Sequence, residues 1–276
     1  VFIGTVTTGA CLSVVSQTKA DNMFQITPSA SAAKVIANDN CFQVCFTDTN
    51  QGTASADYIA SKGLATKVAV IYNSSDAYSS GIYDNFKAEA AAKGLDLVAS
   101  EAFTGDSKQD FSSQLSKIKA SGAELIFLPI YYQEASLILS QAKNAGITAK
   151  FFGCDGLDGL LNIENFDKSL AENVMLLTPF AANATDETTK KFVAAYNAKY
   201  DPSTLNQFAA DAYDAVYVVK AAAEKAGVTG DMSVSDICNA LKGAMTEITV
   251  DGVTGSGMTW KATGEVNKEP KAVQIE

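Results

Sequence analysis

The stretch KVAVIYNSSDAYSSG, residues 67–81, carries the pattern that decides the fold. Its first six residues, KVAVIY (67–72), form a short apolar run with polar neighbours, which is typical of a strand buried on both faces of a sheet. The loop NSSDAYSSG (73–81) follows, and YDNFKAEAAAKG (83–94) has the apolar face of an amphipathic helix, with Gly94 as its C-cap. The stretch therefore predicts a strand, a loop and a helix in succession.

The same unit recurs along the chain. Further apolar runs of strand length are LDLVAS (95–100), AELIFLP (123–129) and NVMLLTP (173–179). Amphipathic helices are predicted between them, over 110–122 with Asp110 as N-cap and Gly122 as stop, and over 135–146. This alternation predicts an α/β fold with parallel central sheets and right-handed crossovers.

The last third of the chain changes in pattern. Residues 185–245 are predicted to form helices, and short β-type pieces return after Thr246. These pieces are ITVDGV (248–253), GMTWKA (257–262) and KAVQIE (271–276). A chain of 276 residues, 47% of them hydrophobic, is long enough for two lobes with a core each. No apolar run approaches the roughly 18 residues of a membrane span.

The charged residues exclude several classes of function. The net charge is −10, which argues against binding of nucleic acid. The chain has no histidine, and all 21 basic side chains are lysine. It therefore has no Ser-His-Asp triad and no histidine metal site, and no guanidinium to grip a carboxylate. An anion must be held by backbone N–H groups, hydroxyls or lysine.

The cysteines do not indicate a cofactor. They are Cys11, Cys41, Cys45, Cys154 and Cys238, an odd number at wide spacing. Neither a zinc site nor a disulfide framework has this spacing, so most of them are expected to be buried thiols outside disulfides.

The Ser-rich and Gly-rich loop 73–81 lacks the lysine and glycines of nucleotide-binding loops. We expect no metal and no cofactor.

Hydroxyl-bearing loops follow the first two predicted strands. TVTTG (5–9) follows the strand that ends at Gly4, and TPSAS (27–31) follows FQI (24–26) and opens a short helix. Ligands of open α/β sheets bind beyond the carboxyl ends of the strands, where helix N-termini favour anions. Thr8, the backbone of Ala30, and Ser31 are therefore candidates for an anion site. Simple helix capping is the alternative.

The loops of the later strands carry aromatic and acidic residues. They contribute Tyr78, Tyr131, Tyr132, Asp155 and Asp158. A carboxylate here, together with the anion site, would suit a zwitterion, with the tyrosines as walls for an apolar side chain. A cap or turn is the alternative role for Asp155, and packing at the end of the sheet is the alternative for the tyrosine pair.

Seven stretches, taken together and in chain order, resemble one family. They are GTVTTG, ITPSAS, CFQVCFTDTNQG, KVAVIYNSSDAYSSG, DFSSQLSKIKASGAELIFLP, FFGCDG and FAADAYDAVY. The family is the branched-chain amino-acid type of periplasmic binding protein, the solute receptors of ABC importers. The resemblance runs from residue 1 to residue 276. It implies the type I fold, in which two α/β lobes with parallel sheets are joined by three crossovers.

The resemblance also implies boundaries and a cellular role. One lobe would comprise 1–64 and 180–247, and the other 66–179 and 248–276. The ligand, a neutral and aliphatic L-amino acid, would bind in the interlobe cleft by hinge closure. The protein would act outside the cytoplasm, in the periplasm or lipid-anchored at the outer face of the cell membrane. It would be a monomer without enzymatic activity, and would deliver its ligand to a membrane permease.

The family's binding residues match this chain at the two hydroxyl-bearing loops. Thr8 matches the loop hydroxyl that binds the ligand α-carboxylate, and Ala30 and Ser31 match backbone and hydroxyl contacts. Gln43 stands where the family often has arginine, which puts a nearby ion pair in doubt.

The later loops match as well. Tyr78 matches a tyrosine that follows the first strand of the opposite lobe, and either Tyr131 or Tyr132 matches an aromatic residue of the cleft. Asp155 matches the acidic residue that takes the ammonium group. Leu157 stands where the family often has tryptophan, which predicts an aliphatic pocket wall.

The family normally has two strand-helix units before the strand that starts here at Val1. At about 30 residues per unit, roughly 60 residues would be absent. The chain is therefore expected to be a fragment whose first lobe is incomplete and exposes a sheet edge.

Three other functions stay open. A sensory or regulatory ligand-binding domain has the same fold. A receptor for a small carboxylate without an amine would use the same hydroxyls. An enzyme would have to use Asp155 and Asp158 as an acid–base pair, for which a Gly-rich turn is a poor frame.

Overall fold

The structure is a computed structural model that describes all of residues 1–276. The chain divides into two compact units. Unit 1 comprises Val1–Thr47 and Pro179–Glu269, and unit 2 comprises Asp48–Thr178 and Pro270–Glu276. The chain thus passes between the units three times, which agrees with the number of crossovers implied by the resemblance.

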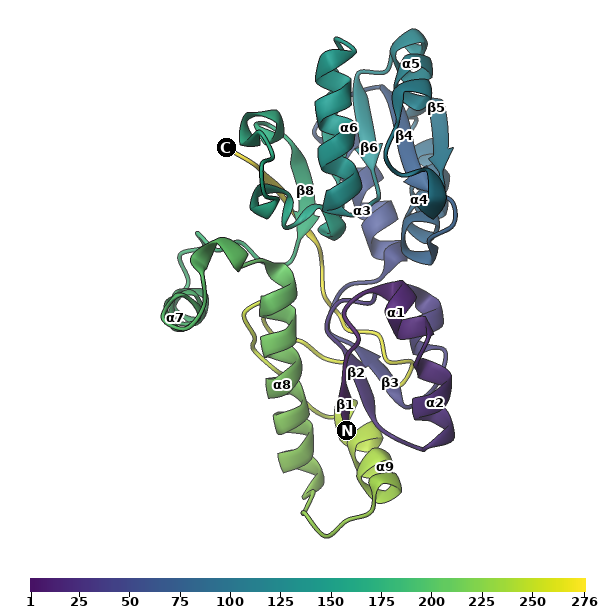
Figure 1. The fold of residues 1–276 in the computed structure, drawn as a ribbon. Helices are drawn as coiled ribbons and strands as arrows, with labels where there is room; N and C mark the ends of the chain where they lie inside the picture. The colour runs from purple at the N-terminus through teal and green to yellow at the C-terminus, as the bar shows by residue number, and fades with distance from the viewer. The chain divides into compact units, whose positions relative to one another are not determined.

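Unit 2 is built on a six-stranded sheet in the order β5-β4-β6-β7-β8-β9 (Figure 1). Its strands are β4 (Lys67–Asn73), β5 (Asp96–Phe103), β6 (Leu125–Leu128), β7 (Lys150–Gly153), β8 (Met175–Thr178) and β9 (Lys271–Gln274). The predicted parallel pairing is confirmed for β4 to β8. Strand β9 is an exception, because it pairs with β8 in the antiparallel direction.

Helices cover both faces of this sheet. They are α3 (Asp48–Ser61), α4 (Ala77–Ala92), α5 (Ser112–Ser121) and α6 (Tyr132–Asn144). Side chains of β4 alternate between the two faces. Val68 and Val70 pack with α3 and α4, whereas Ala69 and Ile71 pack with α5 and α6. Because both faces are buried, the inner strands β6 and β8 are mainly apolar, as the sequence indicated. The expectation of a buried strand is wrong for β5, which lies at the edge of the sheet and has Asp96 and Ser100 exposed.

Three predicted helix starts are wrong by a few residues. Helix α4 begins at Ala77 rather than near residue 83, because the Asp76 carboxylate accepts hydrogen bonds from the N–H groups of Tyr78 and Ser79. Helix α6 begins at Tyr132 rather than near residue 135. Asp110 is not the N-cap of α5. That position belongs to Phe111, and Asp110 accepts from Ser112 N–H in a turn before the helix.

Unit 1 contains a three-stranded parallel sheet in the order β1-β2-β3. Its elements are β1 (Phe2–Ile3), β2 (Gln25–Thr27), β3 (Cys41–Gln43), α1 (Thr8–Leu12), α2 (Val15–Ala20), α7 (Glu187–Asn197), α8 (Gln207–Ala226) and α9 (Val234–Met245). Strand β1 lies at one edge of this sheet.

The two faces of the unit 1 sheet have different partners. Phe24, Ile26 and Phe42 pack with α8 and α9, which lie beside the strands in Figure 1. Cys41, the neighbour of Phe42 in β3, belongs to a smaller buried cluster on the opposite face, together with Cys11 of α1.

Short 3₁₀ helices complete the fold. They span Ala33–Ile36, Gly105–Ser107, Asp155–Leu157, Leu160–Asn162, Lys168–Ala171 and Pro202–Thr204. The first of them is the short helix expected after TPSAS. None of the helices has both the length and the apolar character needed to cross a membrane.

The predicted lobe boundaries differ from the observed units in two segments. Residues 48–64 belong to unit 2, because α3 packs closely against α4. Residues 248–269 belong to unit 1 rather than to unit 2. They form isolated bridges between Val250 and Met258 and between Trp260 and Val266, and the Trp260 indole donates a 2.7 Å hydrogen bond to the Gln43 carbonyl. Only the last predicted piece, as β9, joins the sheet of unit 2.

Candidate functional site

In unit 1, Thr8 connects the two hydroxyl-bearing loops. It is the first residue of α1, yet its hydroxyl does not cap that helix. Its Oγ1 instead accepts hydrogen bonds from the N–H groups of Ser31, at 3.2 Å, and Ala32, at 3.4 Å. The structure therefore brings Thr8 and Ser31 together, and the capping alternative does not describe Thr8.

The loop around Ala30 is fixed by its own hydrogen bonds. Ala30 N–H donates to Thr27 Oγ1 at 3.0 Å, and the Ala30 carbonyl accepts from Gln43 Nε2 at 2.7 Å. The Ala30 N–H is thus engaged within the loop, whereas its carbonyl keeps a second lone pair for another donor. Gln43, which stands in place of the family's frequent arginine, supports this loop through its neutral amide.

Two buried hydroxyl groups in this region have donor capacity left. Thr8 and Ser31 are 1% and 0% exposed. The Ser31 hydroxyl has no hydrogen-bond partner. The Thr8 oxygen accepts two N–H groups, so its proton is left to donate. Buried hydroxyls without partners are costly. The pair is therefore suited to a ligand that accepts hydrogen bonds, such as a carboxylate.

In unit 2, Tyr78 and Asp155 form one hydrogen-bonded group. The Tyr78 hydroxyl donates to Asp155 Oδ1 at 2.6 Å and accepts from Gly156 N–H at 2.9 Å. Both side chains are almost fully buried. Burial, and next the negative charge of Asp155, raises the pKa of Tyr78 well above its usual value. The phenol therefore stays protonated and keeps the carboxylate oriented.

The sequence left open whether Tyr131 or Tyr132 belongs to the site, and the structure places them on different faces of the sheet. The ring of Tyr131 stacks on that of Tyr78, with centroids 4.8 Å apart. Tyr132 starts α6, packs with the core on the other face of the sheet, and lies close to Gly159. Tyr131 is thus grouped with Tyr78 and Asp155, and Tyr132 is not. Burial, followed by the charge of Asp76, raises the pKa of Tyr131.

Gln51, a residue that the sequence analysis missed, positions the backbone of Asp155. Gln51 of α3 is 0% exposed, and its Oε1 accepts from Asp155 N–H at 3.2 Å. Its Nε2 has no partner. The signal available in the sequence was the stretch TDTNQG (47–52), a polar run that opens α3.

A second missed group lies in unit 1, between α8 and the segment 250–268. Lys268 Nζ lies 3.3 Å from Asp211 Oδ1 and donates to Thr254 Oγ1 at 2.5 Å. Asp214 accepts from Val253 N–H, at 2.8 Å, and from Thr254 N–H and Oγ1, at 2.8 and 2.6 Å. Burial raises the pKa of Asp211 to about 6, against the opposing charge of Lys268. The network anchors this segment to α8.

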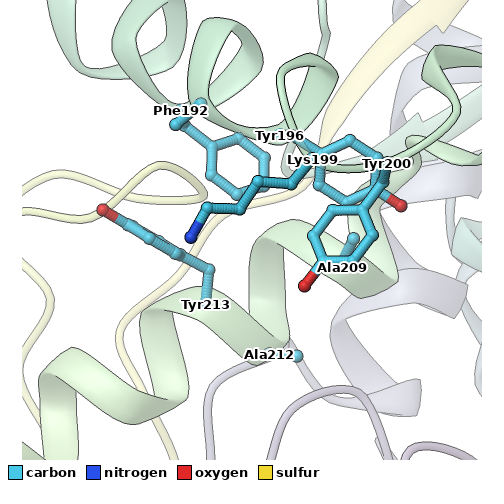
Figure 2. Close-up of a pocket in the computed structure, with 8 residues that line it drawn as sticks. Phe192, Tyr196, Lys199, Tyr200, Ala209, Ala212 and Tyr213 are labelled. Atoms are coloured by element: carbon cyan, nitrogen blue, oxygen red, sulfur yellow. The ribbon is translucent and has the colours of Figure 1, made fainter.

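An open cavity of about 480 Å³ lies elsewhere in unit 1, between α7 and α8 (Figure 2). Aromatic rings form most of its walls, and the Lys199 side chain extends among them. Its lining residues are Phe192, Ala195, Tyr196, Lys199, Tyr200, Ala209, Ala212 and Tyr213. None of the predicted site residues lines this cavity.

Comparison with known proteins gives a consistent result. A family model described as "Periplasmic binding protein" matches residues 1–276. The Leu/Ile/Val-binding protein homolog 3 of Brucella melitensis is 33% identical over 232 residues, 83% of this chain and 61% of the relative. A leucine-, isoleucine-, valine-, threonine- and alanine-binding protein of Pseudomonas aeruginosa is 29% identical, over 80% of this chain and 58% of the relative. The chain thus spans about three fifths of the length of these relatives.

Solved structures show the same fold. The leucine-binding protein LivK of Thermotoga maritima superposes with a TM-score of 0.87 at 25% identity, over 99% of this chain and 76% of the other. LivJ of Streptococcus pneumoniae, a branched-chain amino acid transporter substrate-binding protein in complex with isoleucine, superposes at 0.86 with 28% identity, over 99% and 75%.

Proposed function

This chain belongs to the periplasmic binding protein family, and we propose that it is a receptor for a neutral, aliphatic L-amino acid of the leucine, isoleucine and valine type. The observation that carries the proposal is the pairing of complementary chemistry in one chain. One unit offers two buried hydroxyl donors, and the other offers a buried carboxylate held by a tyrosine. These are the groups that a zwitterion without a charged side chain requires.

The roles of the residues follow from their hydrogen bonds. Thr8 and Ser31 donate to the ligand carboxylate through hydroxyl groups that have no other acceptor. Asp155 accepts from the ammonium group, and the second lone pair of the Ala30 carbonyl is a further acceptor for it. Charge-assisted hydrogen bonds of this kind are about twice as strong as neutral ones, so no guanidinium is needed.

The tyrosines supply an apolar wall. The stacked rings of Tyr78 and Tyr131 present a rigid surface to an aliphatic side chain. Leu157, where the sequence predicted an aliphatic pocket wall, does not extend this surface, because its side chain packs with Tyr132 in the core on the other face of the sheet. Two relatives are named for binding leucine, isoleucine and valine, and one related structure holds isoleucine. These names agree with the proposed side-chain preference.

The biological role proposed with this ligand is transport. The chain acts by binding, as a monomer outside the cytoplasm, and delivers its ligand to the membrane permease of an ABC importer. A sensory domain would bind the same ligand. Uptake of radiolabelled leucine by vesicles that contain the permease distinguishes the two, because it requires the receptor only if the role is transport.

The ligand class is tested by calorimetry on the chain with three matched compounds. L-leucine carries both charged groups, 4-methylpentanoate lacks the amine, and L-leucinamide lacks the carboxylate. The proposal expects binding of leucine, with both analogues weakened by at least about 100-fold, since each leaves a buried partner unpaired. Equal or tighter binding of 4-methylpentanoate would instead identify a receptor for simple carboxylates. Absence of binding by leucine, isoleucine and valine would contradict the proposed function.

A further inference from the structure

Two cysteines from distant parts of the sequence meet in unit 1. Cys11 lies in α1 and Cys41 is the first residue of β3. Both are buried, at 0% and 1% exposure, and both belong to the small cluster on the face of the sheet opposite α8 and α9. The two thiols interact, since each shifts the pKa of the other. Neither cysteine is in a disulfide.

Gln25 of β2 holds the pair from one side. It lies opposite Cys41 in the parallel register of β2 and β3, and its Nε2 donates to Cys11 Sγ at 3.3 Å. The same amide group donates to the Gly4 carbonyl at 2.9 Å, and its oxygen accepts from Thr18 Oγ1 at 2.6 Å. With all of these bonds made, the glutamine amide cannot rotate away. It therefore presents a fixed donor to the Cys11 sulfur.

The two thiols are electrostatically unequal. The interaction with Cys41 lowers the pKa of Cys11, and the same interaction, followed by burial, raises the pKa of Cys41. The amide of Gln25 also donates to Cys11, so this geometry favours Cys11 as the sulfur that forms the thiolate. A thiolate beside a protonated thiol is the arrangement of a dithiol that closes to a disulfide, because only the thiolate attacks.

We propose that Cys11 and Cys41 are a redox-active dithiol that closes to a disulfide by exchange with a low-molecular-weight or protein disulfide. The Cys11 thiolate attacks one sulfur of that reagent and expels the other as a thiolate, which leaves a mixed disulfide. Cys41 then loses its proton and attacks the Cys11 sulfur, which expels the second thiolate. The chain loses two electrons and two protons, and the reagent is reduced to two thiols.

Access to the buried pair is provided by α1. This helix has only five residues, and short helices with few backbone hydrogen bonds open locally at low cost. Closure ties α1, which begins with Thr8, to β3 across the cluster that also contains Ala30 and Ala32. The oxidised chain would therefore have a less mobile hydroxyl-bearing region. The dithiol itself does not depend on the proposed ligand.

The test uses the whole chain, first reduced and then equilibrated with mixtures of reduced and oxidised glutathione. Remaining thiols are alkylated under denaturing conditions and counted by mass spectrometry. The expected change on oxidation is from five alkylated cysteines to three, with a loss of two hydrogens. Trypsin cleaves after lysine, so Cys11 lies in the peptide 1–19 and both Cys41 and Cys45 lie in the peptide 35–62. A second digestion with chymotrypsin, which cleaves after Phe42, separates Cys41 from Cys45. It therefore shows which of the two is crosslinked to Cys11 in the unaltered protein.

Variants supply the matched controls. Cys41→Ser is expected to abolish the crosslink, and Cys238→Ser, at a buried cysteine of another cluster, is expected to retain it. The Phe42 cleavage on the unaltered chain gives the answer even if Cys41→Ser does not fold. A crosslink that joins Cys11 to Cys45, or five alkylated cysteines at every glutathione ratio, would overturn the proposal.

Discussion

The hydroxyl of Tyr78 donates to Asp155 Oδ1 at 2.6 Å and accepts from the N–H of the next residue, Gly156, at 2.9 Å. One phenol therefore fixes both the carboxylate and the backbone of the turn that carries it. Gly156 has no room for a side chain there, since a Cβ atom would lie 2.7 Å from the tyrosine oxygen. The tyrosine is thus a positioning group for Asp155 as well as a wall.

Removal of that hydroxyl is expected to destabilise the chain. Tyr78→Phe leaves a buried N–H and a carboxylate oxygen without this partner, which costs about 1–3 kcal/mol. Urea unfolding measures the loss. Tyr58→Phe is the matched control, because the Tyr58 hydroxyl lies in a half-buried ring without a hydrogen bond to the protein. Equal stability of the two variants would contradict the role given to Tyr78.

Neutralisation of Asp155 is expected to remove amino-acid binding. Asp155→Asn keeps the shape but loses the charge that pairs with the ammonium group, so we expect the Kd for leucine to rise by at least about 100-fold. Calorimetry measures this change. Asp158→Asn, three residues later and half-buried, should leave the Kd within about threefold. If Asp155→Asn bound leucine as the unaltered chain does, Asp155 would be only a turn residue.

The Thr8 hydroxyl can be tested by two substitutions, one that removes the hydroxyl and one that removes only the methyl group. Thr8→Val removes the donor to the ligand and the acceptor for Ser31 and Ala32 N–H. A lost hydrogen bond to a charged group costs about 1.5–3 kcal/mol, which is roughly 10- to 100-fold in Kd. Thr8→Ser keeps the hydroxyl and should bind within a few-fold of the unaltered chain. A loss of affinity in Thr8→Ser but not in Thr8→Val would point to packing of the methyl group rather than to the hydroxyl.

Asp211 is expected to make stability depend on pH. Its folded-state pKa of about 6 lies above the ordinary value of 3.8, so between these pH values the folded state holds a proton that the unfolded state has lost. The contribution of the protonated Asp211 carboxyl to the free energy of unfolding is complete below about pH 3.8 and is lost as the pH rises through 6. Lys268, Asp214 and Thr254 are the polar groups that face it.

The measurement compares Asp211→Asn with the unaltered chain by urea unfolding at several pH values. The difference in free energy of unfolding, unaltered minus variant, should fall by on the order of 2–3 kcal/mol between pH 4 and pH 7. Groups common to both proteins cancel in this difference. A difference that stays constant with pH would show that the Asp211 carboxyl titrates normally.

Gly52 is expected to be intolerant of a side chain. Helices α3 and α4 approach so closely there that a Cβ atom would lie 2.7 Å from the Ile82 carbonyl and from Phe86 N. Gly52→Ala should therefore cost about 1–3 kcal/mol through overpacking. Gly243→Ala, in α9 with no atom near the added methyl, should instead add about 0.5–1 kcal/mol. Thermal unfolding of both variants checks the opposite signs.

The sequence by itself determined the layers of the fold and limited the chemical groups available to the candidate site. Strands buried on both faces must be apolar throughout, so β4, β6 and β8 are visible as short runs between polar residues. Gly122 marks the end of α5 because it adopts the left-handed conformation that glycine favours. The absence of arginine and histidine left hydroxyls, amides and carboxylates as the available binding groups.

The tertiary structure decided what depends on contacts between distant residues. Tyr131 and Tyr132 are adjacent residues of the same type, so the sequence alone does not distinguish them. They differ in the face of the sheet against which each side chain packs. Gln51 reaches Asp155 across 104 positions of sequence, and Thr8 meets Ser31 across 23. The unit to which residues 248–269 belong depends on the core that receives Met258 and Trp260. Local patterns record burial and turns, but they do not record which distant partner completes a buried hydrogen bond.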